Sequence, residues 1–235
     1  RAFPKRDHNW DAGLSDALDD PTYRSVMDVL TSVSGSGPRE NYRIAGFQAR
    51  ATRRILESLR DSATSATVVG AGTGSGKTLA FYLPAFAYLC SLRDGAPWTR
   101  ALAVYPRNEL LRDQFSTAFA NARRLDRVSV DTNGRPLTVG VLNANTPTSA
   151  RWLKGQYSTW KKEPQGYRCP TLTCPGDGFD VCGGHLYWRE SDAEKEIEIL
   201  ECATCRRAFD NSVIVLTRKR MRTSPPDLLF TTTEM

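Results

Sequence analysis

Residues 67–78 read Thr-Val-Val-Gly-Ala-Gly-Thr-Gly-Ser-Gly-Lys-Thr, a glycine-rich turn between two apolar segments. The β-branched start, Thr67–Val69, predicts a short strand, and the apolar run after Gly76 predicts a helix. A glycine-rich turn between a strand and a helix brings backbone N–H groups and the positive end of the helix dipole to one place. Such a turn binds phosphate groups, so the sequence predicts a nucleoside triphosphate here.

Lys77 and Thr78, at the end of this turn, carry the expected catalytic chemistry. The Lys77 ammonium is expected to reach the β- and γ-phosphates, and the Thr78 hydroxyl to ligate Mg²⁺. The alternative interpretation is a structural turn with a chance lysine. The expected phosphate cradle comprises Ala71, Gly72, Thr73, Gly74, Ser75, Gly76, Lys77 and Thr78.

Apolar spacing elsewhere in the chain alternates between helical and strand-like patterns. Strands separated by helices are typical of a parallel sheet with helices on both faces, so we predict an α/β fold. The expected helices are Gly46–Arg60, a segment from Gly76 onward and Leu111–Leu125, and the expected strands are Thr67–Val69, Ala101–Tyr105, Leu137–Leu142, Val213–Leu216 and Leu228–Thr231.

The turn, with the apolar helix and Pro84 that follow it, resembles motif I of superfamily 2 helicases of the DEAD/DEAH-box type. The resemblance implies a RecA-like first lobe that binds ATP and Mg²⁺. Gln48 lies upstream of the turn, where the family places a glutamine that reads adenine. Its amide can donate and accept at the adenine edge. The alternative for Gln48 is a polar helix residue without a ligand.

Two further segments resemble the nucleic-acid-binding motifs of this family. Pro106–Leu110 resembles motif Ia, and Pro226–Met235 resembles motif Ic, whereas Val139–Pro147 matches motif Ib only loosely. The alternative for the first segment is a strand-to-helix turn capped by Asn108. The resemblance implies nucleic-acid contacts by Pro106, Arg107, Asn108, Thr231 and Thr232.

The family places the acidic motif II after motif Ic, where this chain ends. That motif positions Mg²⁺ and the attacking water. We therefore expect a piece of a longer polypeptide that includes a second RecA-like lobe. For the fragment itself, the resemblance implies ATP binding rather than ATP turnover, and the intact protein is expected to be an ATP-dependent helicase.

Five of the six cysteines lie between Cys169 and Cys205, which predicts a zinc ribbon. Cys202 and Cys205 have the spacing that lets two thiolates reach one tetrahedral zinc. Two of Cys169, Cys174 and Cys182 are expected to complete the site, and the spacing does not choose among them. The alternative is a set of free buried thiols.

The composition shift around the cysteines predicts a zinc-ribbon insert within the α/β domain. The basic run Arg218–Arg222 is interpreted as a solvated loop, or alternatively as a contact to a nucleic-acid backbone. The expected divisions are an N-terminal extension at 1–40, the first part of the RecA-like lobe at 41–160, the insert at 161–212, and the continuation of the lobe at 213–235.

Composition and charge limit the classes of partner that the chain is expected to bind. The net charge of +6 permits a polyanion such as nucleic acid. No apolar run approaches the ~20 residues of a membrane span, and Arg1–Pro4 lacks the apolar core of a signal peptide, so we expect a cytoplasmic protein without membrane contact. The pairing of this lobe with a zinc insert looks like the large helicases of bacterial defence and DNA-modification islands, such as the Dpd, DISARM and Druantia systems, which favours DNA over RNA and implies antiviral defence. The alternatives are an ATP-sensing nucleic-acid-binding or scaffold module that does not translocate, and a zinc-ribbon adaptor whose phosphate loop has no function.

Overall fold

The computed structural model describes residues 14, 20–31, 44–61, 64–72, 74–92, 96, 98–155, 159–178, 180 and 182–233. The chain divides into two compact units, and each is described by itself. The first unit holds residues 1–94 and 128–133, and the second holds residues 95–127 and 134–235. Among the described helices, none combines the length and the apolarity that a membrane span requires.

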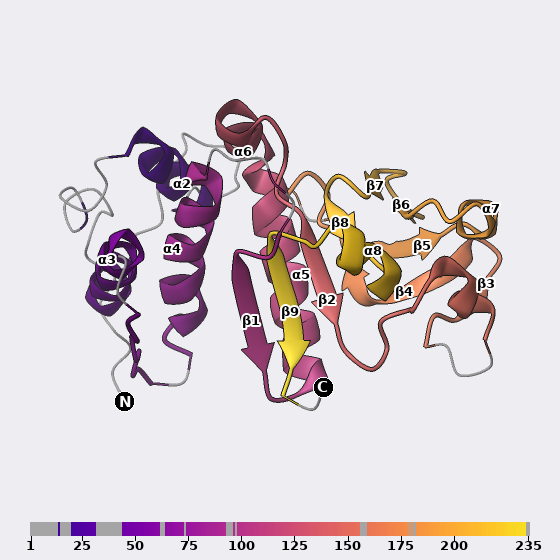
Figure 1. Ribbon diagram of the computed structural model, residues 1–235, viewed down its shortest axis with the longest axis horizontal. Helices are drawn as coiled ribbons and strands as arrows, with labels where there is room; N and C mark the ends of the chain where they lie inside the picture. The colour runs from indigo at the N-terminus through magenta and orange to yellow at the C-terminus, as the bar shows by residue number, and fades with distance from the viewer. Residues whose placement is uncertain are drawn as a thin grey trace. The chain divides into compact units, whose positions relative to one another are not determined.

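Helices make up the regular structure that is described in the first unit (Figure 1). They are α2 (Pro21–Thr31), α3 (Gly46–Arg60) and α4 (Lys77–Ser91), and α4 packs against both of the others. The predicted bounds of α3 are confirmed. Leu83, Phe86 and Leu89 of α4 are buried, and Pro84 lies within the helix, where it removes one backbone hydrogen-bond donor.

The prediction of a strand at Thr67–Val69 is wrong. Residues 64–70 have no regular secondary structure, and the Val68 side chain is 95% exposed. A strand is defined by a neighbour that satisfies its backbone N–H and C=O groups, and all of the described strands β1–β9 belong to the second unit. The β-branched residues therefore give an unpaired segment before the phosphate loop.

A parallel sheet forms the centre of the second unit, as predicted. Its strands lie in the order β1-β9-β2-β8, and every pairing is parallel. The bounds of β1 match the prediction, and the other three strands lie within one or two residues of the predicted ranges. The strands are β1 (Ala101–Tyr105), β2 (Val139–Leu142), β8 (Ile214–Val215) and β9 (Leu228–Thr232).

A separate antiparallel sheet lies between β2 and β8 in the sequence, in the order β3-β4-β5-β6-β7. Trp188 is fully buried at its centre, where Trp160 meets it edge-on at 5.8 Å and its indole N–H donates to the carbonyl of Ile197 at 2.7 Å. The chain thus leaves the parallel sheet, folds this small sheet and returns. The strands are β3 (Lys162–Glu163), β4 (Gly166–Thr173), β5 (His185–Trp188), β6 (Ile199–Cys202) and β7 (Ala208–Asp210).

Helix α5 (Asn108–Arg124) joins the two sheets of the second unit. Phe115 packs edge-on against Phe230 of β9 at 5.3 Å, and one turn later Phe119 packs against Phe209 of β7 at 5.3 Å. The same face of one helix therefore contacts both sheets, which fixes the insert against the parallel sheet (Figure 1). The remaining described elements are α6 (Asp126–Asn133), the 3₁₀ helix η2 (Ala150–Lys154), α7 (Glu190–Glu194) and α8 (Arg218–Thr223).

Candidate nucleotide and metal sites

The phosphate loop closes on its own lysine. The Lys77 ammonium donates to the carbonyls of Ala71, at 2.9 Å, and Gly72, at 2.8 Å. Gly74 and Gly76 have φ values of +75° and +82°, a conformation that an L side chain rarely adopts. Gly76 is also the N-cap of α4, so the loop leads directly into a helix N-terminus. The predicted strand is absent, whereas the turn and the helix that follows it are present.

Two observations show that this loop fits a phosphate group. The Ser75 hydroxyl is buried without a hydrogen-bond partner among the described residues, so it has a polar atom to offer. A Cβ added at Gly70 or Gly72 would meet nothing within 4 Å, so the space beside this backbone is open. Both features suit a glycine-rich backbone that a phosphate approaches closely.

Thr78 lies in the first turn of α4, one residue after Lys77, and its side chain is partly exposed. This position suits a hydroxyl that would ligate Mg²⁺ beside the phosphates. Thr73, which was also predicted for the cradle, lies outside the described residues.

Gln48 is 1% exposed and connects α3 to the phosphate loop. Its side-chain oxygen accepts a hydrogen bond from the backbone N–H of Ala45 at 2.8 Å, which is half of a capping box at the start of α3. Its side-chain nitrogen donates to the carbonyl of Gly76 at 2.8 Å. Gln48 therefore holds the residue that begins α4, and adenine could use only the second lone pair and the second N–H of this amide.

The residues predicted to bind nucleic acid gather at the carboxyl edge of the parallel sheet. Tyr105, at the end of β1, is opposite Thr232 of β9, and its carbonyl accepts from the backbone N–H of Thr233 at 3.2 Å. Pro106 and Arg107 follow β1 directly and are exposed. The structure thus places the motif Ia segment beside the motif Ic segment, although the sequence separates them by the insert.

Thr231 contacts the last residue of β2, and Asn108 contacts the loop that follows this strand. The Thr231 hydroxyl donates to the carbonyl of Leu142 at 2.8 Å, and the Asn143 amide donates to the side-chain oxygen of Asn108 at 3.2 Å. Sequence reasoning matched this loop only loosely to motif Ib. The residue types Asn143 and Thr146, which favour turns, are the sequence features that indicate this loop. The Thr146 hydroxyl donates to the carbonyl of Val141 at 2.8 Å.

The basic run at 218–222 forms helix α8, and the expectation of a loop is wrong. Thr217 caps this helix, because its hydroxyl oxygen accepts from the backbone N–H of Arg220 at 3.1 Å. Arg218 donates to the carbonyls of Asn143, at 2.9 Å, and Thr146, at 3.2 Å. The first residue of the run therefore supports the loop after β2.

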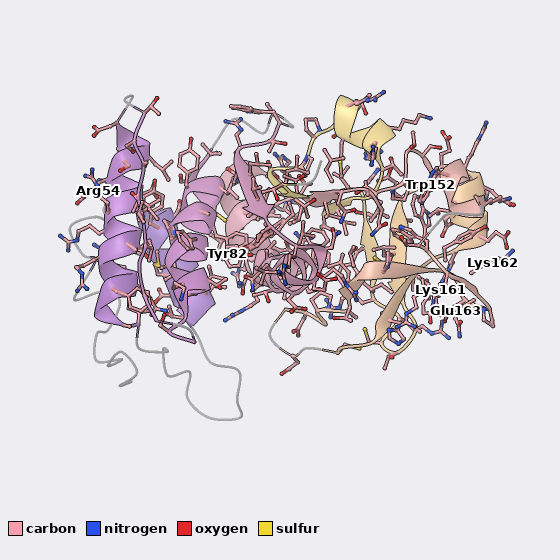
Figure 2. The ribbon with its side chains drawn as sticks, turned by 90° about the horizontal axis from the view of Figure 1, so that it is seen from below. Arg54, Tyr82, Trp152, Lys161, Lys162 and Glu163 are labelled. Atoms are coloured by element: carbon pink, nitrogen blue, oxygen red, sulfur yellow. The ribbon has the colours of Figure 1, made fainter. Side chains whose placement is uncertain are left out.

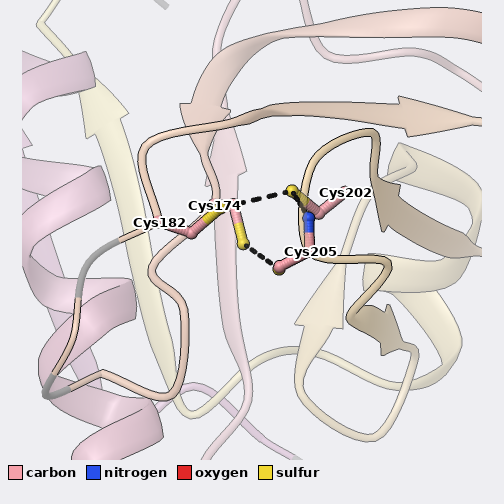
Figure 3. Close-up of side chains that lie close together, drawn as sticks. All are labelled: Cys174, Cys182, Cys202 and Cys205. Carbon is pink, nitrogen blue, oxygen red and sulfur yellow. Dashed lines mark hydrogen bonds between the residues drawn. The ribbon is translucent and has the colours of Figure 1, made fainter.

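Four cysteines of the insert converge (Figure 3). The sulfur atoms of Cys174, Cys182, Cys202 and Cys205 all lie within 4.8 Å of one another. The Cys174–Cys205 and Cys182–Cys202 sulfur distances are 3.6 and 3.7 Å. Zinc–sulfur bonds of about 2.3 Å in a tetrahedron place neighbouring sulfurs about 3.8 Å apart. The spacing of these thiols therefore fits one zinc ion.

The backbone around the cluster supports thiolate ligands. The N–H groups of Gly176, at 3.4 Å, and Thr204, at 3.4 Å, point at the sulfurs of Cys174 and Cys202. Such N–H groups stabilise negative charge on sulfur. A Cβ at Gly184 would lie 2.8 Å from the Cys202 sulfur, so a larger residue there would disturb the cluster.

Cys169 is not part of this cluster. Its sulfur contacts the Thr171 hydroxyl at 3.5 Å, and burial raises the pKa of its thiol, which favours the neutral form. Among the candidates that the spacing left open, the structure thus brings Cys174 and Cys182 to the pair Cys202 and Cys205.

Sequence reasoning missed a partly buried ion pair that joins the segment before β2 to the residue before β9. Arg135 donates to both carboxylate oxygens of Asp227 at 2.7 Å. The same carboxylate accepts from the backbone N–H of Thr138 at 2.8 Å and from its hydroxyl at 2.9 Å. Because Asp227 immediately precedes β9, this pair fixes the start of the strand that carries Thr231 and Thr232.

Comparison with known proteins agrees with the motif I resemblance. Residues 46–141 match the family model described as DEAD/DEAH box helicase. The chain is 32% identical over 143 residues to "Druantia protein DruE" of Escherichia coli (strain UMEA 4076-1), across 56% of this chain. The chain spans only 7% of the length of that relative. The family match confirms the resemblance to DEAD/DEAH-box helicases for residues 46–141, and the second match shows a likeness to one Druantia protein.

Proposed function

We propose that this chain is the ATP-binding first motor lobe of an ATP-dependent superfamily 2 helicase or translocase that acts on DNA in bacterial defence. The observation that carries the proposal is the phosphate loop formed by residues 70–78, because it combines left-handed glycines, an orphaned hydroxyl and a lysine at the start of a long helix. This loop lies within residues 46–141, which match the DEAD/DEAH box helicase family model.

The residues of the loop divide the work of nucleotide binding. Lys77 exchanges its two carbonyl partners for β- and γ-phosphate oxygens, and the N-terminal N–H groups of α4 face the same anion. The Thr78 hydroxyl would hold Mg²⁺, which would supply positive charge beside the phosphates. ATP turnover in the intact parent needs a carboxylate that positions water, supplied together with a second lobe by the rest of the polypeptide.

The carboxyl edge of the parallel sheet is the proposed nucleic-acid contact. Arg107 offers an exposed guanidinium, and Asn108 begins α5, whose N-terminal N–H groups suit a phosphate. Thr231 and Thr232 end the neighbouring strand. DNA is proposed over RNA on the resemblance of the chain to large helicases of bacterial defence and DNA-modification islands.

The four-cysteine cluster is proposed to hold a structural zinc ion. All four positions of a tetrahedral zinc would be filled by thiolates, which leaves no open position for a substrate. The metal would fix β5 and β6, and through α5 the insert's place on the parallel sheet.

The test of the nucleotide site is Lys77→Ala, measured as ATP affinity by calorimetric titration. We expect a loss of roughly 10- to 100-fold, because a charged hydrogen-bond donor to the phosphates disappears. Lys195→Ala removes an equal charge from an exposed turn of the insert and should leave the affinity unchanged. Unaltered ATP binding by a folded Lys77→Ala protein would refute the site.

ATP hydrolysis by the intact parent separates a motor from an ATP-sensing module. Single-stranded DNA should stimulate hydrolysis by a motor more than RNA of the same sequence does. Hydrolysis that responds to neither strand would favour a sensing or scaffold module that does not translocate.

A further inference from the structure

A groove of about 650 Å³ lies between α5 and β4, within the second unit. Arg112, Ser116 and Thr117 line it from α5, and Lys161 and Arg168 line it from the insert. The Ser116 hydroxyl donates to the carbonyl of Thr171 at 3.3 Å, which joins the two walls at the floor. The groove thus exists only because the insert packs on this helix.

The groove continues the proposed nucleic-acid edge along one face of α5. Asn108, Arg112 and Ser116 are four residues apart, so they lie in one row on the helix surface. The first residue of this row bonds to the loop after β2, and the next two line the groove. A strand bound at the sheet edge would therefore reach the groove without leaving this face of the helix.

The charges in the groove favour a polyanion. Arg112 and Lys161 are exposed, and neither forms an ion pair within the described part of the chain. Arg168 is only loosely paired, with Glu163 at 3.6 Å, and one carboxylate, Asp113, lines the same groove. By contrast, the adjacent Lys162 is neutralised by Glu190 at 2.8 Å. Figure 2 labels both Lys161 and Lys162 on the insert.

The hydroxyl groups of the groove add neutral donors for phosphate oxygens. The Ser116 and Thr117 hydroxyls donate to the carbonyls of Thr171 and Asp113, so the donors that the groove offers to phosphate oxygens are the hydroxyls of Thr159 and Thr173. Cations that fix a backbone phosphate together with hydroxyl donors, and without reading bases, are typical of sequence-independent contacts to nucleic acid.

We propose that this groove binds the phosphate backbone of single-stranded DNA beyond the sheet edge, so that the zinc insert extends the strand path of the motor. The inference rests on the proposed function, since it assumes that a strand lies at the carboxyl edge of the sheet. It assigns the strand contact of the insert to Arg112, Lys161 and Arg168.

The test is binding of a fluorescently labelled oligothymidylate to the zinc-loaded chain, followed by anisotropy over a range of salt concentrations. The variant is Arg112→Ala combined with Lys161→Ala. Each lost phosphate contact lowers the salt slope by about 0.7 for a single strand, so we expect a decrease of about 1.4 and, near 0.1 M salt, roughly 25-fold weaker binding. The matched control is Lys195→Ala with Arg207→Ala, which removes the same charge from exposed positions of the insert.

Two further measurements keep the outcomes distinct. Thr117→Glu adds a negative charge to the groove at an exposed helix position and should also weaken binding, even if the double variant fails to fold. Equal slopes for the wild type and the double variant, with binding still lost on Arg107→Ala, would overturn the groove and leave the sheet edge intact. Equal losses in the groove variant and the control would also overturn it. A chain that binds ATP through Lys77 but no DNA would overturn the groove and leave the nucleotide site standing.

Discussion

The Arg135–Asp227 pair should contribute about 2 kcal/mol to the stability of the second unit, and Asp227→Asn tests this. The carboxylate is nearly buried, with 6% of its side chain exposed, and it accepts four hydrogen bonds. Asparagine keeps one acceptor oxygen, and its NH₂ group must then face at least one donor. Loss of the charge-assisted pair costs about 3 kcal/mol, and the exposure of 30% of Arg135 lowers this to about 2 kcal/mol because water replaces part of it.

Urea unfolding, followed by the fluorescence of the buried Trp160 and Trp188, measures this loss. With a slope of about 2 kcal/mol per molar urea, the midpoint should fall by about 1 M. Arg135→Met and the double variant complete a cycle that isolates the pair, and a coupling of more than about 1 kcal/mol is expected. A fall in the urea midpoint of less than about 0.3 M, or a coupling energy near zero, would refute a stabilising role for this ion pair.

Zinc content and the pH dependence of stability test the insert. Elemental analysis should find about one zinc per chain, with zinc lost in Cys202→Ser and kept in Cys169→Ser, because only Cys202 belongs to the cluster. Zinc loss in both variants would contradict the proposed ligands. Burial raises the pKa of Glu198, although it accepts from the backbone N–H of Leu216 at 2.8 Å and from the Thr217 hydroxyl at 2.6 Å. A raised folded-state pKa means that its stabilising contribution is fully present below the unfolded value of about 4.3 and is lost as pH rises through the folded value. The stability of the wild type relative to Glu198→Gln, from urea unfolding at several pH values, should therefore fall between pH 4.5 and neutrality, and a rise over that interval would contradict the burial.

Local pattern was sufficient where a segment's own residues determine its structure. The helix Gly46–Arg60 and the strand Ala101–Tyr105 have the bounds that apolar spacing predicts. Helix α8 is also predictable from local sequence, because Thr217 is a favourable N-cap residue immediately before the basic run.

Long-range partners determined the rest. Residues Thr67–Val69 have strand-forming side chains but no paired neighbour among the described residues, and β propensity alone supplies none. The choice of Cys174 and Cys182 over Cys169 depends on how β4 bends into the loop before β5, which spacing does not specify. Gln48 could be identified by its place, but its bond to Gly76 could not, because it joins residues that only the folded unit brings together.

The strand order of the parallel sheet sets the sequence of events in folding. Strand β9 lies between β1 and β2, yet it follows every other strand of the unit in the chain. The pairing of Ala101 with Leu228 therefore closes a loop that contains the whole insert, and such distant pairings are slow to form. During synthesis, the four cysteines leave the ribosome before β9 does. Zinc binding to them would therefore shorten the flexible segment between β1 and β9 and speed the pairing of these two strands. Zinc-starved cells would then accumulate chains whose central strand has not yet joined its neighbours.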